Sequence, residues 1–336
     1  MSIRTNHPMT DGHSRRTWLA LALGGLATLA TRSRATASGY PARPVQLVVP
    51  YAAGGGADLL SRRMAGLMAR HLGGSVVVEN RVGAAGVVAA QSVAQAAPDG
   101  HTLLIGASTH VAQKALNPAV PFDPLRDFTH VVRTSSAQSV LVVPADSPWR
   151  TLEDLLRDVR SAPGRFNYAS GGIGSTAHLA GMALATAARL NVVHVPYRGS
   201  VDIIPSLLAR DTQFAFPVQI TAQPLIEQGK VRALAVSGER RSPRLPGVAT
   251  LAELMSDPQL VVEGWSGIWV PSGTPAAVVR AIEDTVRTTM ADPELVAASE
   301  ALGLHLWLTR SPAEFTDFVR SESVRYASWL SHQVAR

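Results

Sequence analysis

The sequence of 336 residues contains no cysteine. Without thiols there can be no disulfide, no thiolate metal site, no cysteine nucleophile and no lipid-modified cysteine anchor. Hydrophobic residues make up 46% of the chain and charged residues only 17%, a composition that indicates folded domains with apolar cores rather than disorder. The length is that of two domains of modest size.

Lysine is nearly absent, since Lys114 and Lys230 are its only occurrences. Most of the formal net charge of +6 comes from the first 37 residues, where five arginines and one aspartate contribute +4 and leave +2 for the remaining chain. A nucleic-acid groove needs clustered cations with interleaved aromatic residues, whereas the arginines here are scattered. We therefore expect no nucleic-acid partner.

Long apolar runs are missing after the N-terminal region, so nothing later reaches the ~18 residues that indicate a membrane span. The shorter run Trp18–Ala30 follows the pair Arg15-Arg16 and precedes Ala35-Thr36-Ala37. This order predicts a signal peptide over residues 1–37 that is cleaved after Ala37. The arginine pair favours the twin-arginine type, and a general secretory signal is the alternative. Both routes predict a periplasmic protein.

Strand and helix patterns alternate along the rest of the chain. Val45–Val49 is predicted as a buried strand, Asp58–Leu72 as a helix and Ser75–Glu79 as a second strand. Further strands are predicted over 101–105, 138–143, 166–169, 192–195, 214–218, 232–236 and 261–270, helices over 86–97 and 175–190, helix starts at Thr151, Thr274-Pro275 and Ser311-Pro312, and surface segments over 117–128 and 238–248. The alternation indicates parallel, doubly wound α/β sheets.

The order of these units predicts one domain interrupted by another. Domain 1 is expected to comprise residues 38–138 plus 262–336, and domain 2 residues 139–261. Two crossings, near 131–142 and 258–268, would form a two-strand hinge. Ligands of such folds bind where the carboxyl ends of strands from both domains face each other.

Three glycine-containing turns join a strand to a helix, over 51–58, 170–176 and 194–200. Glycine lets backbone N–H groups approach a ligand, and the helix N-terminus beyond each turn favours an anion. Close packing explains any single turn equally well, but three turns with hydroxyls indicate anion capture. Asp58 could cap its helix or orient the first turn, and a structural role is favoured for it. The candidate ligand-binding residues are Tyr51, Ala53, Gly54, Gly55, Gly56, Asp58, Ser170, Gly171, Gly174, Ser175, Thr176, His178, Tyr197, Arg198, Gly199 and Ser200.

A hydrolase is the alternative raised by the same region, because Ser175, His178, His194 and Asp202 lie close together in sequence. However, the sequence around Ser175 lacks the G-x-S-x-G elbow, and a serine at a helix start is usually a cap. The first turn contains neither G-x-G-x-x-G nor a Walker lysine, and the histidines lack a carboxylate at metal-ligand spacing. We therefore predict a binding protein that is not an enzyme and that holds no metal or cofactor.

Several stretches of the mature chain together resemble a known family. They are YPARP at 40–44, VPYAAGGGAD at 49–58, VENR at 78–81, PDGHTLL at 98–104, FDP at 122–124, HVPYRG at 194–199, WSG at 265–267 and PSGTP at 271–275. In this order they are similar to the extracytoplasmic solute receptors of tripartite tricarboxylate transporters, the Bordetella uptake gene family. The resemblance runs from Tyr40 to about Trp329 and implies a type II periplasmic-binding-protein fold, in which two α/β domains close on a ligand like a Venus flytrap.

The resemblance also implies a ligand and a partner. The ligand would be a small carboxylate or related solute, held by the three turns. The partner would be the membrane subunits of a tripartite tricarboxylate-type transporter or, alternatively, a sensor protein, and we expect the receptor to be a monomer. The sequence departs from the family at Ala52-Ala53, where two prolines are usual, and at Pro217, where an acidic residue is common. The loss of that acidic residue favours plain carboxylates over ligands with an amino group.

Overall fold

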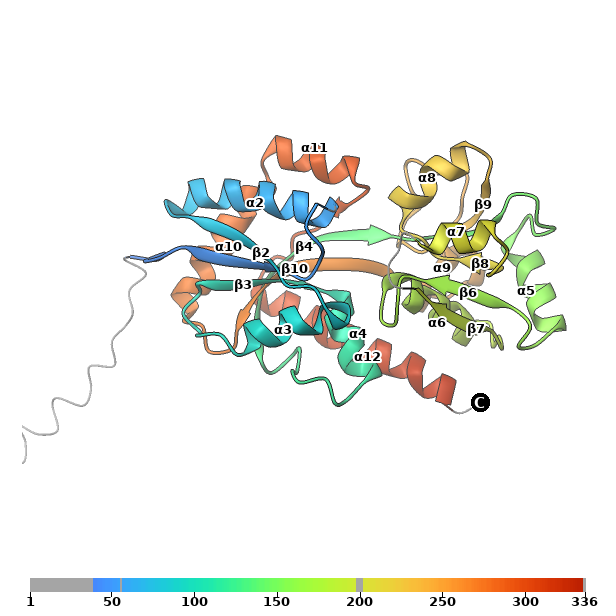
Figure 1. Cartoon of the computed structure of the whole chain (residues 1–336), viewed down its shortest axis with the longest axis horizontal. Coiled ribbons are helices and arrows are strands. Elements are labelled where there is room, and N and C mark those ends of the chain that lie inside the picture. The colour runs from blue at the N-terminus through green and yellow to red at the C-terminus, as the bar shows by residue number, and fades with distance from the viewer. Residues whose placement is uncertain (1–38, 55, 198–201, 335–336) are drawn as a thin grey trace, which may run out of the picture. The chain divides into compact units, whose positions relative to one another are not determined.

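The computed structural model describes residues 39–54, 56–197 and 202–334. Residues Gly39–Arg336 form one compact unit that contains two β-sheets with helices packed against them (Figure 1). The predicted α/β class with two sheets is therefore confirmed. The predicted signal peptide over residues 1–37 lies outside the described residues.

The first sheet has the strand order β11-β4-β10-β3-β1-β2. β1 pairs in parallel with β2 and β3, whereas β10 runs antiparallel between β3 and β4, and β11 is antiparallel to β4. The sheet is thus mixed, where the sequence pattern predicted parallel strands. Its strands are β1 (Val45–Val49), β2 (Val76–Asn80), β3 (Thr102–Ala107), β4 (Phe128–Gln138), β10 (Glu263–Pro271) and β11 (His305–Leu306).

Helices cover both faces of this sheet, with α2, α10 and α11 on one side and α3, α4 and α12 on the other (Figure 1). Alternate residues of a strand therefore enter different cores: Leu47 packs with the α2 side and Val48 with the α3 side, and both are fully buried. This explains why Leu47, Val48 and Val49 of β1 are apolar in succession. The helices are α2 (Gly56–Leu72), η1 (Ala84–Gly86), α3 (Val87–Ala94), α4 (Ser108–Leu116), α10 (Ala276–Met290), α11 (Pro293–Ala301) and α12 (Pro312–Val334).

The second sheet has the order β7-β6-β8-β5-β9. β6 pairs in parallel with β7 and β8, and β5 runs antiparallel to β8 and β9. Its strands are β5 (Val140–Pro144), β6 (Asn167–Ser170), β7 (Val193–Pro196), β8 (Phe214–Ala215) and β9 (Val231–Val236), and its helices are α5 (Leu152–Ser161), α6 (Thr176–Ala187), α7 (Ile203–Leu208), α8 (Gln219–Glu227), α9 (Leu251–Met255) and η3 (Pro258–Leu260).

Three helix starts were predicted from capping residues, and two are confirmed. The Thr151 hydroxyl accepts from the Asp154 N–H at 3.1 Å, and the Asp154 carboxylate accepts from the Thr151 N–H in return. The Ser311 hydroxyl likewise accepts from the N–H of Glu314. At Thr274-Pro275 the helix start is displaced by one residue, since α10 begins at Ala276, and the capping role of Thr274 is wrong because its hydroxyl donates back to the carbonyl of Pro271 at 2.8 Å.

The chain passes between the sheets twice, after β4 and before β10, and both crossings are hydrogen-bonded to Ser237 at the end of β9. Ser237 donates its N–H to the Ser139 carbonyl at 2.9 Å, and its hydroxyl accepts from the Ser139 N–H at 2.9 Å. The same hydroxyl donates to the Val262 carbonyl at 2.6 Å. The crossing residues are therefore fixed to one another, while the predicted division into two domains at 138/139 and 261/262 stays a prediction.

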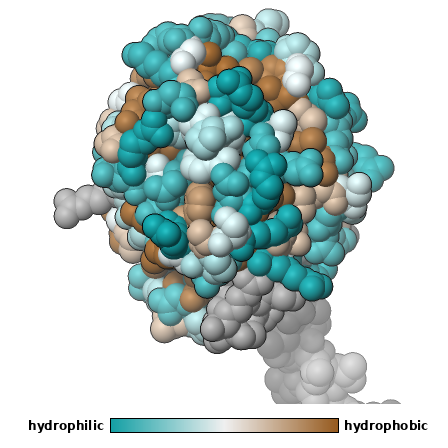
Figure 2. Space-filling model, turned by 90° about the vertical axis from the view of Figure 1, so that its right-hand side faces the viewer, coloured by the Kyte–Doolittle hydropathy of each residue, from teal (hydrophilic) through white to brown (hydrophobic). Residues whose placement is uncertain are grey.

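The surface offers little contiguous apolar area on the face drawn in Figure 2, where hydrophilic residues predominate and apolar ones are scattered among them. Single exposed apolar side chains, such as Leu59 and Val82, are ordinary on a water-exposed surface. None of the described helices is long and apolar enough to cross a membrane.

Candidate functional site

Two adjoining cavities lie beside the carboxyl ends of β1, β3 and β6. The first, of about 290 Å³, is lined by α2, β3, β4 and β10 and by the starts of α4 and α6. The second, of about 500 Å³, lies between residues 82–86 and residues 171–177. Tyr51, Thr109, Thr176 and Val218 line both, so the two cavities form one continuous site with walls from both sheets.

Hydroxyl groups from both sides point to this site without a partner. Tyr51 begins the first strand–helix turn, Ser108 and Thr109 open α4, and Thr176 opens α6, and all of them line a cavity. Within the described residues, none of these four hydroxyls makes a hydrogen bond. A Cβ on Gly264 would come within 2.6 Å of the Thr176 hydroxyl oxygen, so the glycine in β10 permits this close approach. The site therefore offers free donors to a ligand.

Two helix N-termini add backbone donors. α4 and α6 begin at the site from opposite sides, with Ser108 and Thr176 as their first residues. The first N–H groups of a helix have no acceptor within it, and the helix dipole makes this end attractive to anions. Among the described residues that line the two cavities there is no Asp, Glu, Lys, Arg or His. Within this described lining, a bound negative charge would thus be met by N–H and O–H groups.

Asp58 supports the first turn from beneath. Its carboxylate accepts from the Gly54 N–H at 2.9 Å, from Asn80 Nδ2 at 2.8 Å and from Arg62 Nε at 3.0 Å. The Arg62 bond, followed by those of Gly54 and Asn80, lowers the pKa of Asp58 to about 2. Asn80 also donates to the Tyr51 carbonyl. The side chain of Asp58 is only 1% exposed, and of the two structural roles left open by the sequence its contacts with Gly54 and Asn80 favour orientation of the turn.

Two stacked histidines support the second turn. The rings of His178 and His194 lie 3.9 Å apart between centroids. His178 Nδ1 accepts from the Gly174 N–H at 3.0 Å, and His194 Nε2 lies 2.6 Å from the Ser170 hydroxyl. Burial lowers the pKa of His194 to about 4, and burial together with the charge of His194 lowers that of His178 to about 3. Both rings are therefore neutral near pH 7.

These contacts do not assemble the hydrolase that the sequence raised as an alternative. The Ser175 hydroxyl accepts from the backbone N–H of His178 at 3.3 Å and caps α6. The two histidine rings bond to Gly174 and Ser170 instead of Ser175. Within the described residues, Ser175, His178, His194 and Asp202 thus form no serine–histidine–aspartate relay.

The remaining predicted residues divide into three groups. Tyr51, Gly171, Ser175 and Thr176 line the cavities. A second group lines neither cavity. In it, Ala53 and Gly54 are exposed and Gly56 begins α2. Ser170, Gly174 and His178 support the second turn, and the Tyr197 N–H donates to the Ser170 carbonyl at 2.9 Å. Gly55, Arg198, Gly199 and Ser200 lie outside the described residues.

Sequence reasoning missed the contributions of α4 and β4. α4 was not predicted, because Ala107, the residue before it, has no side chain that could cap a helix. The Ala107 N–H instead donates to His110 Nδ1 of the first turn of α4, at 2.9 Å. In β4 the consecutive polar residues Thr134, Ser135 and Ser136 line the first cavity. Their polarity concealed a strand that pairs with β10 along its length.

The profile of one family, the tripartite tricarboxylate transporter family receptor, matches residues 60–331. The chain belongs to this receptor family. The family resemblance inferred from the sequence is thereby confirmed.

Relatives of this receptor extend over most of its length. A protein of Pseudomonas sp. (strain P51), described as a UPF0065 protein in the tcbD-tcbE intergenic region, is 36% identical over 307 residues, which is 90% of this chain and 91% of the relative. The protein BugT of Bordetella pertussis is 31% identical over 310 residues, 90% of this chain and 93% of the relative.

Solved structures share the receptor's fold. The periplasmic binding protein BugD has a TM-score of 0.73 at 30% identity, covering 87% of this chain and 98% of its own. An R. palustris protein with adipate has a TM-score of 0.75 at 29% identity, covering 87% and 98%. MatC from Rhodopseudomonas palustris with bound malate has a TM-score of 0.74 at 30% identity, covering 86% and 99%.

Proposed function

We propose that this receptor captures a small carboxylate solute in the two adjoining cavities and delivers it to the membrane subunits of a tripartite tricarboxylate-type transporter. The observation that carries the proposal is the convergence of α4 and α6, from opposite sides, on a site whose described lining residues offer free hydroxyls and carry no charge. Such donors suit a carboxylate group. The adipate and malate in the two solved relatives support this chemistry.

We place the receptor in the periplasm, in agreement with the leader over residues 1–37 and with the compartment given for BugD. The proposed receptor is a monomer and performs no chemistry, because the serine and histidines near the site support its turns through hydrogen bonds. Of the sixteen residues predicted to contact ligand, we retain Tyr51, Gly171, Ser175 and Thr176 as cavity-lining candidates.

A thermal-shift panel tests ligand capture. The purified protein is heated with mono-, di- and tricarboxylates, with amino acids and with chloride as the reference anion. A ligand present at a hundred times its dissociation constant stabilises the folded state by about 2.7 kcal/mol, so at least one carboxylate should raise the melting temperature while chloride does not. If no carboxylate does so, the proposal is refuted.

A deletion strain tests the partner. Loss of the gene should abolish uptake of the radiolabelled ligand, and complementation should restore it. Normal uptake combined with the loss of a transcriptional response to the ligand would instead support the sensing module.

A further inference from the structure

The first cavity continues from the hydroxyl groups into an apolar compartment beneath α2. Its apolar walls are Leu60 and Met64 of α2, Ile105 of β3, Met290 of α10, Leu295 of α11, and Leu304 before β11, and hydroxyl residues of β4 and β10 line the opposite side. Thr109 and Thr176, which open α4 and α6, line the same cavity. A molecule whose carboxylate lies at the two helix N-termini can therefore extend an apolar part into this compartment.

The walls of the compartment are held in place by the core. Met64, Ile105 and Leu295 are buried members of the cluster that α2 forms with the first sheet. The Leu304 N–H donates to the Ser299 carbonyl at 2.9 Å. The compartment is therefore formed by packed side chains and does not depend on the turns that flank the site.

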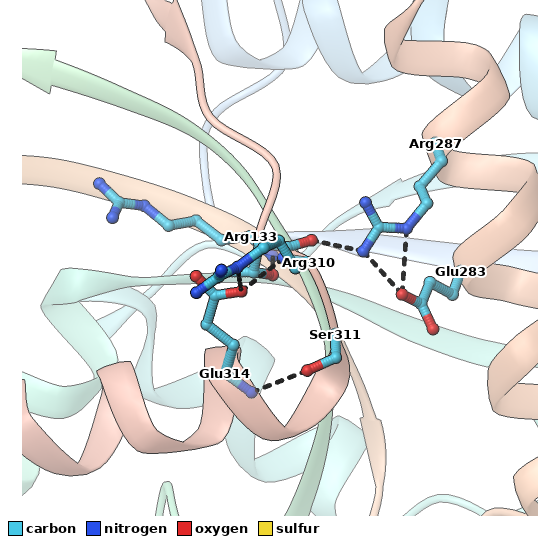
Figure 3. Close-up of polar contacts among 7 residues, drawn as sticks. Arg133, Glu283, Arg287, Arg310, Ser311 and Glu314 are labelled. Atoms are coloured by element: carbon cyan, nitrogen blue, oxygen red, sulfur yellow. Dashed lines mark hydrogen bonds and ion pairs between the residues drawn. The ribbon is translucent and has the colours of Figure 1, made fainter.

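The segment after Leu304 is fastened as well (Figure 3). Arg287 of α10 reaches to the Thr309 carbonyl and to Glu283, which accepts at 2.7 and 3.0 Å. The Thr309 hydroxyl accepts from the Arg133 N–H at 3.2 Å, which ties this segment to β4. The wall that Leu304 provides is thus anchored to α10 and β4.

The chemistry of the compartment is selective. A second carboxylate placed against the apolar walls would be desolvated with no charged partner among the described lining residues. Of the hydroxyls beside these walls, Ser61 and Thr134 donate to backbone carbonyls and Ser135 pairs with Ser266, which leaves the Ser136 hydroxyl to meet it. A hydrocarbon placed there would instead lose only its contact with water. An apolar cavity of about 150 Å³ holds a molecule the size of benzene, and the whole first cavity, its hydroxyl-lined end included, has about 290 Å³, so an aromatic ring or a medium-length alkyl chain fits beside a carboxylate.

Building on the proposed function, we infer that the ligand is an amphipathic monocarboxylate whose alkyl or aromatic body fills the compartment formed by Leu60, Met64, Ile105 and Leu295. Its carboxylate lies at the N-termini of α4 and α6. The preference is thus opposite to that suggested by the dicarboxylates, adipate and malate, found in the two solved relatives.

Isothermal titration calorimetry with two matched series tests this inference. The purified protein is titrated with butyrate, hexanoate and octanoate, and with succinate, adipate and suberate. Each buried methylene contributes about 0.8 kcal/mol, so affinity should rise about fourfold per methylene along the first series. Suberate should bind more weakly than octanoate. Equal or tighter binding of the dicarboxylates, with no trend in the first series, overturns this inference alone, whereas no binding in either series also overturns carboxylate capture.

A pair of variants on α2 locates the compartment. Leu60→Lys places an ammonium group at the cavity wall, and Leu59→Lys is the control, because Leu59 is 59% exposed and does not line the cavity. Leu60→Lys should weaken octanoate binding at least tenfold and strengthen suberate binding, and Leu59→Lys should change neither. Leu60→Gln keeps the position uncharged, so it should weaken octanoate without strengthening suberate. Unchanged octanoate affinity in both Leu60 variants, with melting temperatures confirming folded protein, contradicts the inference.

Discussion

Gln113 Nε2 donates a 2.6 Å hydrogen bond to the carbonyl oxygen of Ile173. The bond joins α4, on the first sheet, to the turn that precedes α6, on the second. Gly174 adopts φ +79°, and a Cβ there would come within 2.8 Å of Gln113 Nε2. The glycine thus permits both the turn and the contact across the ligand site.

Loss of this contact should weaken ligand binding. Gln113→Ala removes a bond between the two sides of the site, and a neutral hydrogen bond is worth about a two- to tenfold change in the dissociation constant. Gln228→Ala is the control, since Gln228 is exposed at the end of α8 and makes only backbone bonds. Calorimetric affinities that are equal in the two variants would show that the contact does not contribute to capture.

The hydrogen bonds that Asp58 accepts beneath the first turn should make the free energy of unfolding depend on pH in the acid range. The pKa of Asp58 is lowered to about 2, so its stabilising contribution is complete above its unfolded value of about 4 and is lost as the pH falls toward 2. Asp58→Asn should therefore be less stable than the wild type near pH 7, and the difference should shrink as the pH falls through this window. Urea denaturation at several pH values measures it, with exposed Asp211→Asn as the control. A constant difference would contradict the assignment.

The histidine stack predicts a separate pH window for the second turn. The folded-state pKa of His194 is about 4, below its ordinary value of 6.5. Protonation is therefore disfavoured by folding, and stability should decline as the pH falls from 6.5 toward 4. His194→Gln should flatten this decline, whereas the exposed His71→Gln should leave it unchanged. An equally steep decline in His194→Gln, measured by urea denaturation, would refute the prediction.

The cap of α6 should be replaceable by another capping residue. Ser175→Ala removes the acceptor for the His178 N–H and should lower the free energy of unfolding by about 1 kcal/mol. Ser175→Asn retains a capping oxygen and should stay near the wild-type value. Equal stability of the alanine and wild-type proteins would exclude a capping role.

Sequence reasoning succeeded where a local signal determined the structure. The capping pair of Thr151 and Asp154 and the Ser311 cap lie at the predicted helix starts, because each needs only neighbouring residues. Thr274 had the same local signal, yet its hydroxyl bonds back to Pro271. A local pattern offers two acceptable partners in such a case, and the surrounding fold selects one.

Site residues were predicted only where they lie in a glycine-containing turn between a strand and a helix. Tyr51 and Thr176 belong to recognisable strand–helix turns, and both line the cavities. Ser136 of β4 and Leu295 of α11 carry no such signal, because they meet α2 only after the sheet has formed. The apolar compartment is a product of tertiary packing, and periodicity within one segment could not predict it.

A crystal structure of the receptor with the tightest carboxylate from the calorimetric series tests the central claim most directly. The account predicts carboxylate oxygens within hydrogen-bonding distance of the first N–H groups of α4 and α6 and of the Thr109 and Thr176 hydroxyls, with the remainder of the ligand pointing toward Leu60. A carboxylate bound instead to an arginine side chain outside the two cavities would contradict it.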